Sequence, residues 1–295
     1  MNPVLKWTLA AAGTAVALAF LVPGVIWLES EAVIERRYPL ASTTVAAVHD
    51  ARSIARGAHL VTIAGCADCH GRNLEGRLLG GTGTLPIWSS NLRRMAHSMS
   101  DEEFERAIRY GITPAATSTW AMPAFDYIYM SEADVVAVVS YLRTLAPAGA
   151  IRPEAAFDMR ARFAIARGDL EPIAPRTLES AASLDLGPRY DGGRYLARIS
   201  CSDCHDTDLT GSADGTAPDL NVVAHYDRSA FFALLRAGKS ADGRPLRTMP
   251  RLAATRFHAF ADYEIDALYD YLAARAHVLV KPAREQARFH TIQNR

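Results

Sequence analysis

The chain has no excess of either charge and very few cysteines. Its 295 residues include 32 Lys plus Arg and 32 Asp plus Glu, so the formal net charge is zero. A nucleic-acid-binding domain or a polybasic membrane-surface protein would show a basic excess. Four Cys are too few for a disulfide scaffold. Apolar residues at 49% and charged residues at 22% exclude bulk disorder, and the length suits about two domains.

A long apolar run lies near the N-terminus. From Trp7 to Leu28 no residue is charged, and a helix of that length spans roughly 30 Å of hydrocarbon. We expect residues 1–30 to form an uncleaved transmembrane anchor, followed by a linker at 31–50. A cleaved signal peptide is the alternative, because Ala17-Leu18-Ala19 resembles a small-residue cleavage site. Cleavage there would leave an exposed apolar stub, which favours the anchor.

Two parts of the sequence repeat each other. Residues 56–76 resemble residues 192–211, with Cys66 aligned on Cys201. Further along, Met122-Pro123 corresponds to Met249-Pro250. Two copies of this size indicate two small domains rather than a solenoid. We predict a domain at 51–147, a connector at 148–186, a domain at 187–280 and a polar tail at 281–295.

Both copies are predicted to be mainly helical, which makes the fold class all-α. Apolar residues recur at helical spacing after several candidate caps. These caps are the pairs Ser100–Glu103 and Ser131–Asp134 in the first copy, and Asp227 and Asp262 in the second. In the connector, Phe157 to Ile165 is expected to be packed.

Long segments rich in Gly, Pro, Thr and Ser separate the predicted helices. They cover residues 71–99, 111–130, 206–226 and 238–260. Structureless loops of this length are unusual in a compact domain. We therefore expect them to wrap around a large group that is not protein.

Each copy contains one C-x-x-C-H motif. The motifs are Cys66-Ala-Asp-Cys69-His70 and Cys201-Ser-Asp-Cys204-His205, and they use all four Cys. This pattern is the signature of covalent haem c attachment, in which two thiols add to the vinyl groups of one porphyrin and the His binds the iron. Zinc is the alternative, but a zinc ribbon needs its second Cys pair close by. A redox dithiol is also less favoured, because of the adjoining His and the missing βαβ pattern.

Repeat-equivalent methionines are the candidates for the second axial position of each iron. Met122 and Met249 each precede a Pro, and each follows an equivalent glycine, Gly111 or Gly238, by 11 residues. Met95, Met99 and Met130 have no counterpart in the other copy. His97 and His225 are interpreted as solvated residues or as residues that support the haem site without binding iron. The remaining His are interpreted as surface or packing residues. His/Met ligation fills both axial positions, which leaves single-electron transfer as the function.

Smaller features have weaker interpretations. Gly57 and Gly192 are expected to let the first helix of each copy cross the last one closely, beside Tyr141 and Tyr271, although ordinary helix packing would explain them equally well. Some further polar and aromatic residues are candidates to line the haem or bind its propionates, with packing roles favoured for each: Trp88, Trp120, Asn91, Arg109 and Arg236.

With these residues in view, the chain resembles the membrane-anchored di-haem cytochromes c, which are built from class I cytochrome c domains. The resemblance rests on GCADCHGRNLEG, the SNL at 90–92, AIRYGI, AMPAF and SEADVVAVVSYLRTL, and covers about 51–147 and 187–276. It implies two tandem all-α domains behind the anchor and two covalently bound haem c groups. The implied axial pairs are His70 with Met122 and His205 with Met249.

The resemblance also implies a cellular setting. Such chains often serve as the electron-accepting cytochrome subunit of a bacterial membrane-bound dehydrogenase, and pass electrons to quinone, a soluble cytochrome or a terminal oxidase. The anchor would then be single-pass in the inner membrane, with the haem domains in the periplasm. Relatives often carry three haems, so the specific complex stays open.

The resulting prediction is an electron carrier without catalytic residues, with no nucleic-acid partner. The alternative is a di-haem peroxidase or a thiosulfate-oxidising enzyme, which would need one open or unusually ligated iron. A haem-based sensor would need a labile axial position. Carbon monoxide binding to the reduced protein distinguishes these classes from a carrier.

Overall fold

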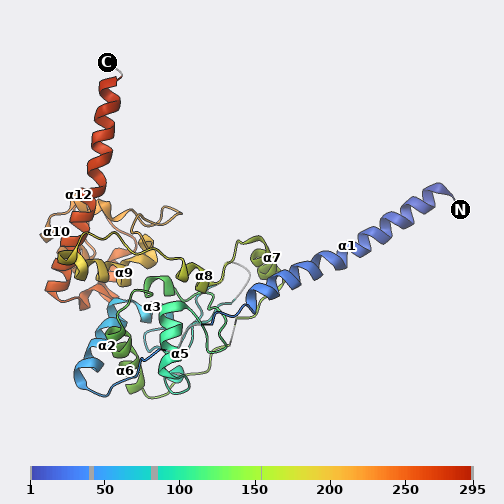
Figure 1. Cartoon of the computed structure of the whole chain (residues 1–295), viewed down its shortest axis with the longest axis horizontal. Coiled ribbons are helices and arrows are strands. Elements are labelled where there is room, and N and C mark those ends of the chain that lie inside the picture. Colours follow the sequence, from blue (N-terminus) through green and yellow to red (C-terminus); the bar gives the residue numbers. More distant parts are fainter. Residues whose placement is uncertain (1, 40–42, 81–85, 154, 294–295) are drawn as a thin grey trace.

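The computed structural model describes residues 2–39, 43–80, 86–153 and 155–293. Within these ranges the regular structure is helical, apart from isolated bridges between Leu78 and Trp88 and between Ile112 and Ser118. The all-α prediction is therefore confirmed. Two helical bundles lie side by side, and α1 and the end of α12 project from them (Figure 1).

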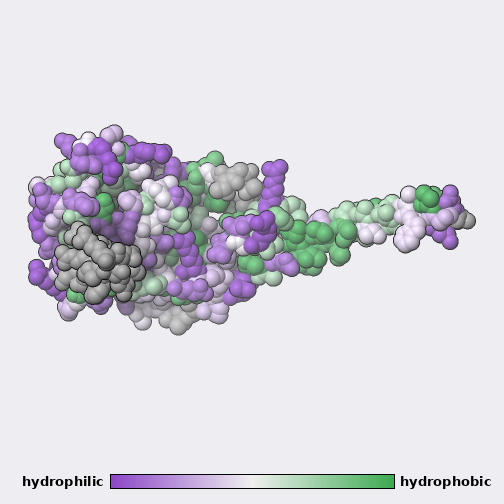
Figure 2. Space-filling model, turned by 90° about the horizontal axis from the view of Figure 1, so that it is seen from above, coloured by the Kyte–Doolittle hydropathy of each residue, from purple (hydrophilic) through white to green (hydrophobic). Residues whose placement is uncertain are grey.

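Helix α1 (Pro3–Ile34) contains the apolar run and continues a few residues beyond the expected boundary at residue 30. Its most apolar 18-residue window has a mean hydropathy of 2.2, and none of that window is buried by protein. Pro23 lies inside the helix without ending it. Figure 2 shows α1 as a rod, mostly apolar or neutral in colour, that leaves the body. These properties fit a membrane anchor.

The first copy is built from short helices around one long pair. Helix α2 crosses α6, and the buried side chains at their crossing include Leu60, Val135 and Val139. The elements are α2 (Ala51–Ile63), α3 (Cys66–His70), α4 (Leu92–Met95), α5 (Asp101–Glu105), the π-helix η1 (Arg106–Tyr110), the 3-10 helix η2 (Ala124–Asp126) and α6 (Glu132–Thr144).

The second copy repeats this plan with α9 crossing α12. Its elements are the 3-10 helix η3 (Pro188–Tyr190), α9 (Asp191–His205), the 3-10 helix η4 (Leu220–His225), α10 (Arg228–Ala237), α11 (Met249–Thr255), the 3-10 helix η5 (Phe257–Ala259) and α12 (Asp262–Gln293). Residues 281–293, predicted as part of a polar tail, continue α12.

The connector carries α7 (Met159–Arg167) and α8 (Ile173–Leu178). Ala161 and Ile165 of α7 are buried, as expected for this segment, and α7 packs against the end of α1. The connector therefore ties the anchor to the two bundles.

The helix caps differ in detail from their predictions. Ser100 and Glu103 form the predicted reciprocal capping box, and Asp227 caps α10. The Ser131 hydroxyl accepts from the backbone N–H of Asp134, but the Asp134 carboxylate binds Arg56 and Tyr195 instead of reaching back.

The prediction that Asp262 caps a helix is wrong. Asp262 is the first residue of α12, and the Glu264 carboxylate accepts from the backbone N–H of Ala261 at 3.0 Å. Asp262 pairs with Arg236 instead. A carboxylate from inside the first turn of α12 therefore accepts the hydrogen bond of the backbone N–H that precedes the helix.

Each copy requires a glycine where its two long helices cross closely. The prediction names the right glycine in the first copy and is off by one position in the second. A Cβ on Gly57 would lie 1.9 Å from the carbonyl oxygen of Ala137, beside Tyr141. In the second copy the equivalent residue is Gly193, whose Cβ would lie 2.0 Å from the carbonyl oxygen of Ala267, beside Tyr271. Gly192 has open space around it, so its predicted role is wrong.

Gly65 explains this shift. It takes a left-handed conformation, with φ +74°, and separates α2 from α3, whereas α9 runs unbroken into its motif. The first copy therefore has one more residue between its packing glycine and its first Cys.

The two copies are joined through polar contacts between their long helices. His59 of α2 lies 2.9 Å from the carboxylate of Glu264 at the start of α12. The Tyr195 hydroxyl of α9 donates to the Asp134 carboxylate at the start of α6, at 2.6 Å. Apolar side chains of both copies belong to one continuous core.

Candidate haem sites

The first C-x-x-C-H motif occupies a single turn of helix. Cys66 and Cys69 are three positions apart in α3, a spacing that places two side chains on one helix face. Both Cys side chains are half-buried, and His70 at the end of the turn is buried. One short helix therefore presents two sulfurs and an imidazole.

Each motif His is held through one ring nitrogen. His70 Nδ1 lies 2.8 Å from the carbonyl oxygen of Ser90, and His205 Nδ1 lies 2.7 Å from that of Pro218. A carbonyl oxygen can only accept, so Nδ1 carries the hydrogen and Nε2 keeps its lone pair. Burial lowers the pKa of both imidazoles, which favours the neutral form. This arrangement is the usual one for an imidazole that binds a metal through its other nitrogen.

The predicted residues of the first copy meet around one cavity. Cys66, Cys69, His70 and Met122 all line it. The remaining lining residues are mainly apolar and come from α2 and the two residues after it, from α4, η1 and α6, and from the 122–130 segment. They are Leu60, Val61, Ala64, Gly65, Leu92, Ile108, Pro123, Tyr127, Met130, Val138 and Leu142, and the acidic residues Asp68 and Asp203 also line the cavity. A lining of this composition suits an apolar group.

The second motif has the same ligand types on a longer helix. Cys201, Cys204 and His205 form the last turn of α9 and are half-buried. Met249 was expected on a loop, but it is the first residue of α11, half-buried against the core. Its pairing with His205 stays a prediction.

In both copies the segment that carries the candidate methionine packs against a glycine in the left-handed conformation. Gly238 has φ +67°, and a Cβ there would lie 2.3 Å from the Cα atom of Pro250, next to Met249. Gly111 has φ +65°, and its Cβ would lie 3.2 Å from that of Ala124, two residues after Met122. Only glycine adopts such a conformation at little cost. The same backbone device therefore positions both segments.

Burial is the main influence on the first Cys sulfur of each motif. Burial raises the pKa of the Cys66 thiol to about 11 and that of Cys201 to about 12, and the Arg256 guanidinium opposes both shifts. A reactive thiolate would need a lowered pKa. The burial suits sulfur atoms that attach a buried group.

Arg256 is a residue that sequence reasoning missed. It belongs to the second copy, is 5% exposed, and places Nη2 3.4 Å from the carbonyl oxygens of Ile63 and Ser200, which lie just before the two motifs. Its Nη1 lies 3.5 Å from the carboxylate of Asp68 inside the first motif. No periodicity or motif marks this arginine. The two motif turns consequently share one buried cation.

The secondary candidates have protein partners. Asn91 donates to the carbonyl oxygens of Ala148 and Ala150, and Arg109 pairs with Glu105. Arg236 pairs with Asp262, Trp88 lies under Arg152, and Trp120 packs on Phe157. These contacts explain each of the five residues by packing.

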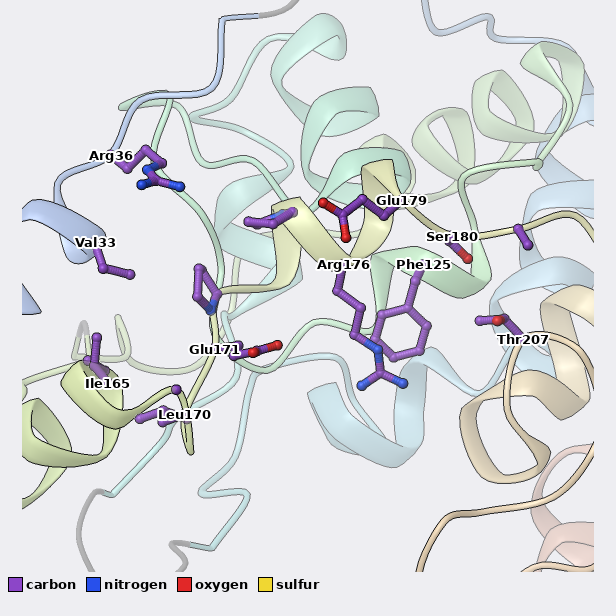
Figure 3. A pocket seen from close by; sticks show the side chains of 14 residues that line it. Val33, Arg36, Phe125, Ile165, Leu170, Glu171, Arg176, Glu179, Ser180 and Thr207 are labelled. Carbon is purple, nitrogen blue, oxygen red and sulfur yellow. The ribbon is translucent and has the colours of Figure 1, made fainter.

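A second cavity, of about 580 Å³, lies outside both motifs. Figure 3 shows it between the end of α1 and the residues just after it (Val33 and Arg36), the connector (Ile165 and Leu170) and both copies (Phe125 and Thr207). Arg176 lies over the Phe125 ring there, with 4.1 Å between its Cζ and the ring centroid. None of the predicted haem residues lines this cavity.

Comparison with known proteins identifies the first copy. Residues 52–142 match the family described as cytochrome c oxidase, cbb3-type, subunit III. No curated protein matches the chain. The chain therefore carries a cytochrome c domain of the membrane type, which implies covalently bound haem c and a role in electron transfer.

The residues of the first copy fit such a group. Two sulfurs one turn apart, an imidazole with a free Nε2 and a thioether all face one apolar cavity. An imidazole and a thioether would together bind the iron of such a group, and a thioether ligand would raise its reduction potential.

Proposed function

We propose that this chain is a membrane-anchored di-haem c-type cytochrome that transfers single electrons. The observation that carries the proposal is the cavity in which Cys66, Cys69, His70 and Met122 meet. The second haem is supported by the repeated motif and by the same Nδ1-to-carbonyl contact at His205.

Each predicted residue has a role in this proposal. Cys66 and Cys69, and Cys201 and Cys204, hold the two porphyrins through thioether bonds. His70 with Met122 would bind one iron, and His205 with Met249 would bind the other. When bound, haem c supplies an iron that gains and loses one electron. The protein orients the imidazoles, excludes water from the apolar cavity and leaves no axial position for oxygen or peroxide.

The proposed setting is the bacterial inner membrane, with both haem domains in the periplasm. The electron donor would be the catalytic subunit of a membrane-bound dehydrogenase, and the acceptor would be quinone, a soluble cytochrome or a terminal oxidase. The match to a family named for an oxidase subunit supports a respiratory setting. The exposed apolar α1 supports the membrane attachment.

The test produces the full chain in a bacterial host with an intact haem c maturation system. The intact mass of the wild type should include two haem groups. The double variants Cys66→Ser/Cys69→Ser and Cys201→Ser/Cys204→Ser should each lose one. A wild-type mass with one haem, unchanged in the second variant, would limit the protein to a single haem.

Carbon monoxide then tests the axial ligands. Reduced wild-type protein should bind none, because both irons are capped by methionine. Met122→Ala should bind one equivalent while it keeps both haems. Carbon monoxide binding by the wild type would overturn the carrier proposal and favour a peroxidase, a thiosulfate-oxidising enzyme or a sensor.

A further inference from the structure

Helix α7 lies beside the end of the membrane anchor. Its Arg162 side chain is 14% exposed and lies 2.7 Å from the carboxylate of Glu31. The same guanidinium donates to the Ser30 hydroxyl at 3.0 Å, and its Cζ lies 5.2 Å from the Trp27 ring centroid. Figure 1 shows α7 on the side of the body from which α1 departs. The contacts of Arg162 therefore fix α7 against one short stretch of α1.

That stretch marks a depth in the bilayer. The uncharged part of α1 ends at Leu28, and Glu29 and Glu31 follow. Trp27 is an aromatic at the end of the apolar run, where such residues lie at the level of the lipid headgroups. Because α7 contacts Trp27, Ser30 and Glu31, it lies at the same level.

The two faces of α7 differ. Ala161 and Ile165 are buried against the protein, whereas Met159 and Phe163 are 45% and 48% exposed. Arg160 and Arg167 are exposed near them, and Arg167 has its Cζ 5.5 Å from the Phe163 ring centroid while it pairs with Asp169 at 3.1 Å. Large apolar side chains flanked by arginines are the composition of helices that lie in a membrane interface.

We propose that α7 is such an interfacial helix. Met159 and Phe163 enter the boundary between headgroups and acyl chains, and Arg160 and Arg167 face lipid phosphates. The occupant of this face is the surface of the bilayer that α1 spans, because the face continues directly from the end of α1. The inference rests on the proposed membrane anchor. It gives the two domains a second attachment, so that they are held at one orientation above the membrane.

The experiment uses the full haem-loaded chain in nanodiscs that contain phosphatidylethanolamine and phosphatidylglycerol. Single cysteines are introduced as Phe163→Cys and Met159→Cys and carry a nitroxide spin label. Leu18→Cys in α1 is the lipid-exposed reference, and Tyr263→Cys, at a side chain that is 71% exposed in the second copy, is the water-exposed reference. Wild-type protein should take up no label, because its four Cys are expected to be in thioethers.

For each label we measure how much oxygen and a water-soluble nickel chelate speed up its relaxation. The same sample under nitrogen is the baseline, so that the contribution of the irons to the relaxation is subtracted. Labels at 159 and 163 should show an oxygen-to-nickel ratio several-fold above that at 263. A water-like ratio at both positions, with a lipid-like ratio at 18, would overturn the inference and leave the anchor intact. Shielding from both reagents would mean that protein covers α7, which also overturns it.

A water-like ratio at position 18 would overturn the anchor and this inference together. Labelling of the wild type would contradict haem attachment without bearing on α7. The outcomes for the anchor, the haem groups and α7 are therefore separate.

Discussion

The Tyr195 hydroxyl donates to the Asp134 carboxylate at 2.6 Å. This contact between the two copies is the counterpart of the contact between His59 and Glu264. Tyr195 lies two residues after Gly193, as His59 lies two residues after Gly57. Asp134 and Glu264 both lie in the first turn of the last helix of their copy. Each copy therefore offers a carboxylate to the first helix of the other. The two contacts are therefore reciprocal, as they are across a two-fold interface.

Tyr195→Phe should weaken this interface. It removes a hydrogen bond to a charged group, which stabilises a protein by about 1.5–3 kcal/mol when partly buried. The midpoint of thermal unfolding, followed by far-UV circular dichroism, should fall. Tyr263→Phe is the control, because Tyr263 is 71% exposed, and it should leave the midpoint unchanged. Equal effects of the two variants would contradict the assigned contact.

Arg256→Met should affect both haem sites from one position. The variant removes a buried cation that lies between the two motifs and should destabilise the protein by about 2 kcal/mol. A positive charge favours the reduced form of a nearby iron, so its removal should lower both midpoint potentials in a potentiometric titration.

Arg251 provides the matched control. It also reaches Asp68, at 3.4 Å, but its side chain is 59% exposed. Arg251→Met should change stability by about 0.5 kcal/mol or less. If Arg256→Met shifted neither potential, the shared-cation interpretation would be wrong.

The glycine assignments give a test with an internal control. Gly57→Ala and Gly193→Ala would each force a Cβ to about 2 Å from a carbonyl oxygen of the crossing helix. Each should cost about 1–3 kcal/mol of stability or more. Gly192→Ala meets open space and should be neutral or stabilise by up to about 1 kcal/mol. Thermal unfolding of the three variants should separate Gly193 from its neighbour.

The same glycines show how far the sequence alone reaches. The motifs, most caps and the helix pair of each copy could be predicted, because they depend on local spacing and local hydrogen bonds. The alignment on Cys66 and Cys201 could not reveal the extra residue that Gly65 introduces, since only the helix crossing shows which glycine is needed.

Other features depend on contacts between distant parts of the chain. The sequence carries no sign that Arg256 lies between the two motifs, because its partners are backbone carbonyls of both copies. The docking of α7 against α1 is equally hidden, since Arg162 and Glu31 are far apart in the chain. Met249 was expected on a loop, yet Pro250 follows it at the start of a helix, a position that suits proline.

Asp126→Asn should raise stability at neutral pH. Asp126 is 1% exposed, and neither carboxyl oxygen has a hydrogen-bond partner among the described residues. Burial raises the pKa of Asp126 well above its ordinary value of 3.8, and the carboxylate of Asp203 adds to this rise. Above pH 3.8 the unfolded chain loses this proton before the folded chain does, so stability falls as pH rises toward the folded pKa.

Asparagine cannot ionise, so the stability of the Asp126→Asn variant does not fall in this way as pH rises. The variant should gain about 1 kcal/mol or more at pH 7, and the gain should disappear as the pH falls to about 4. Asp169→Asn, at a side chain that is 57% exposed, should show no comparable pH-dependent gain. Thermal midpoints of the three proteins between pH 4 and pH 7 test this. A stability difference that stays constant across that range would mean that folding does not raise the pKa of Asp126, which would contradict the prediction.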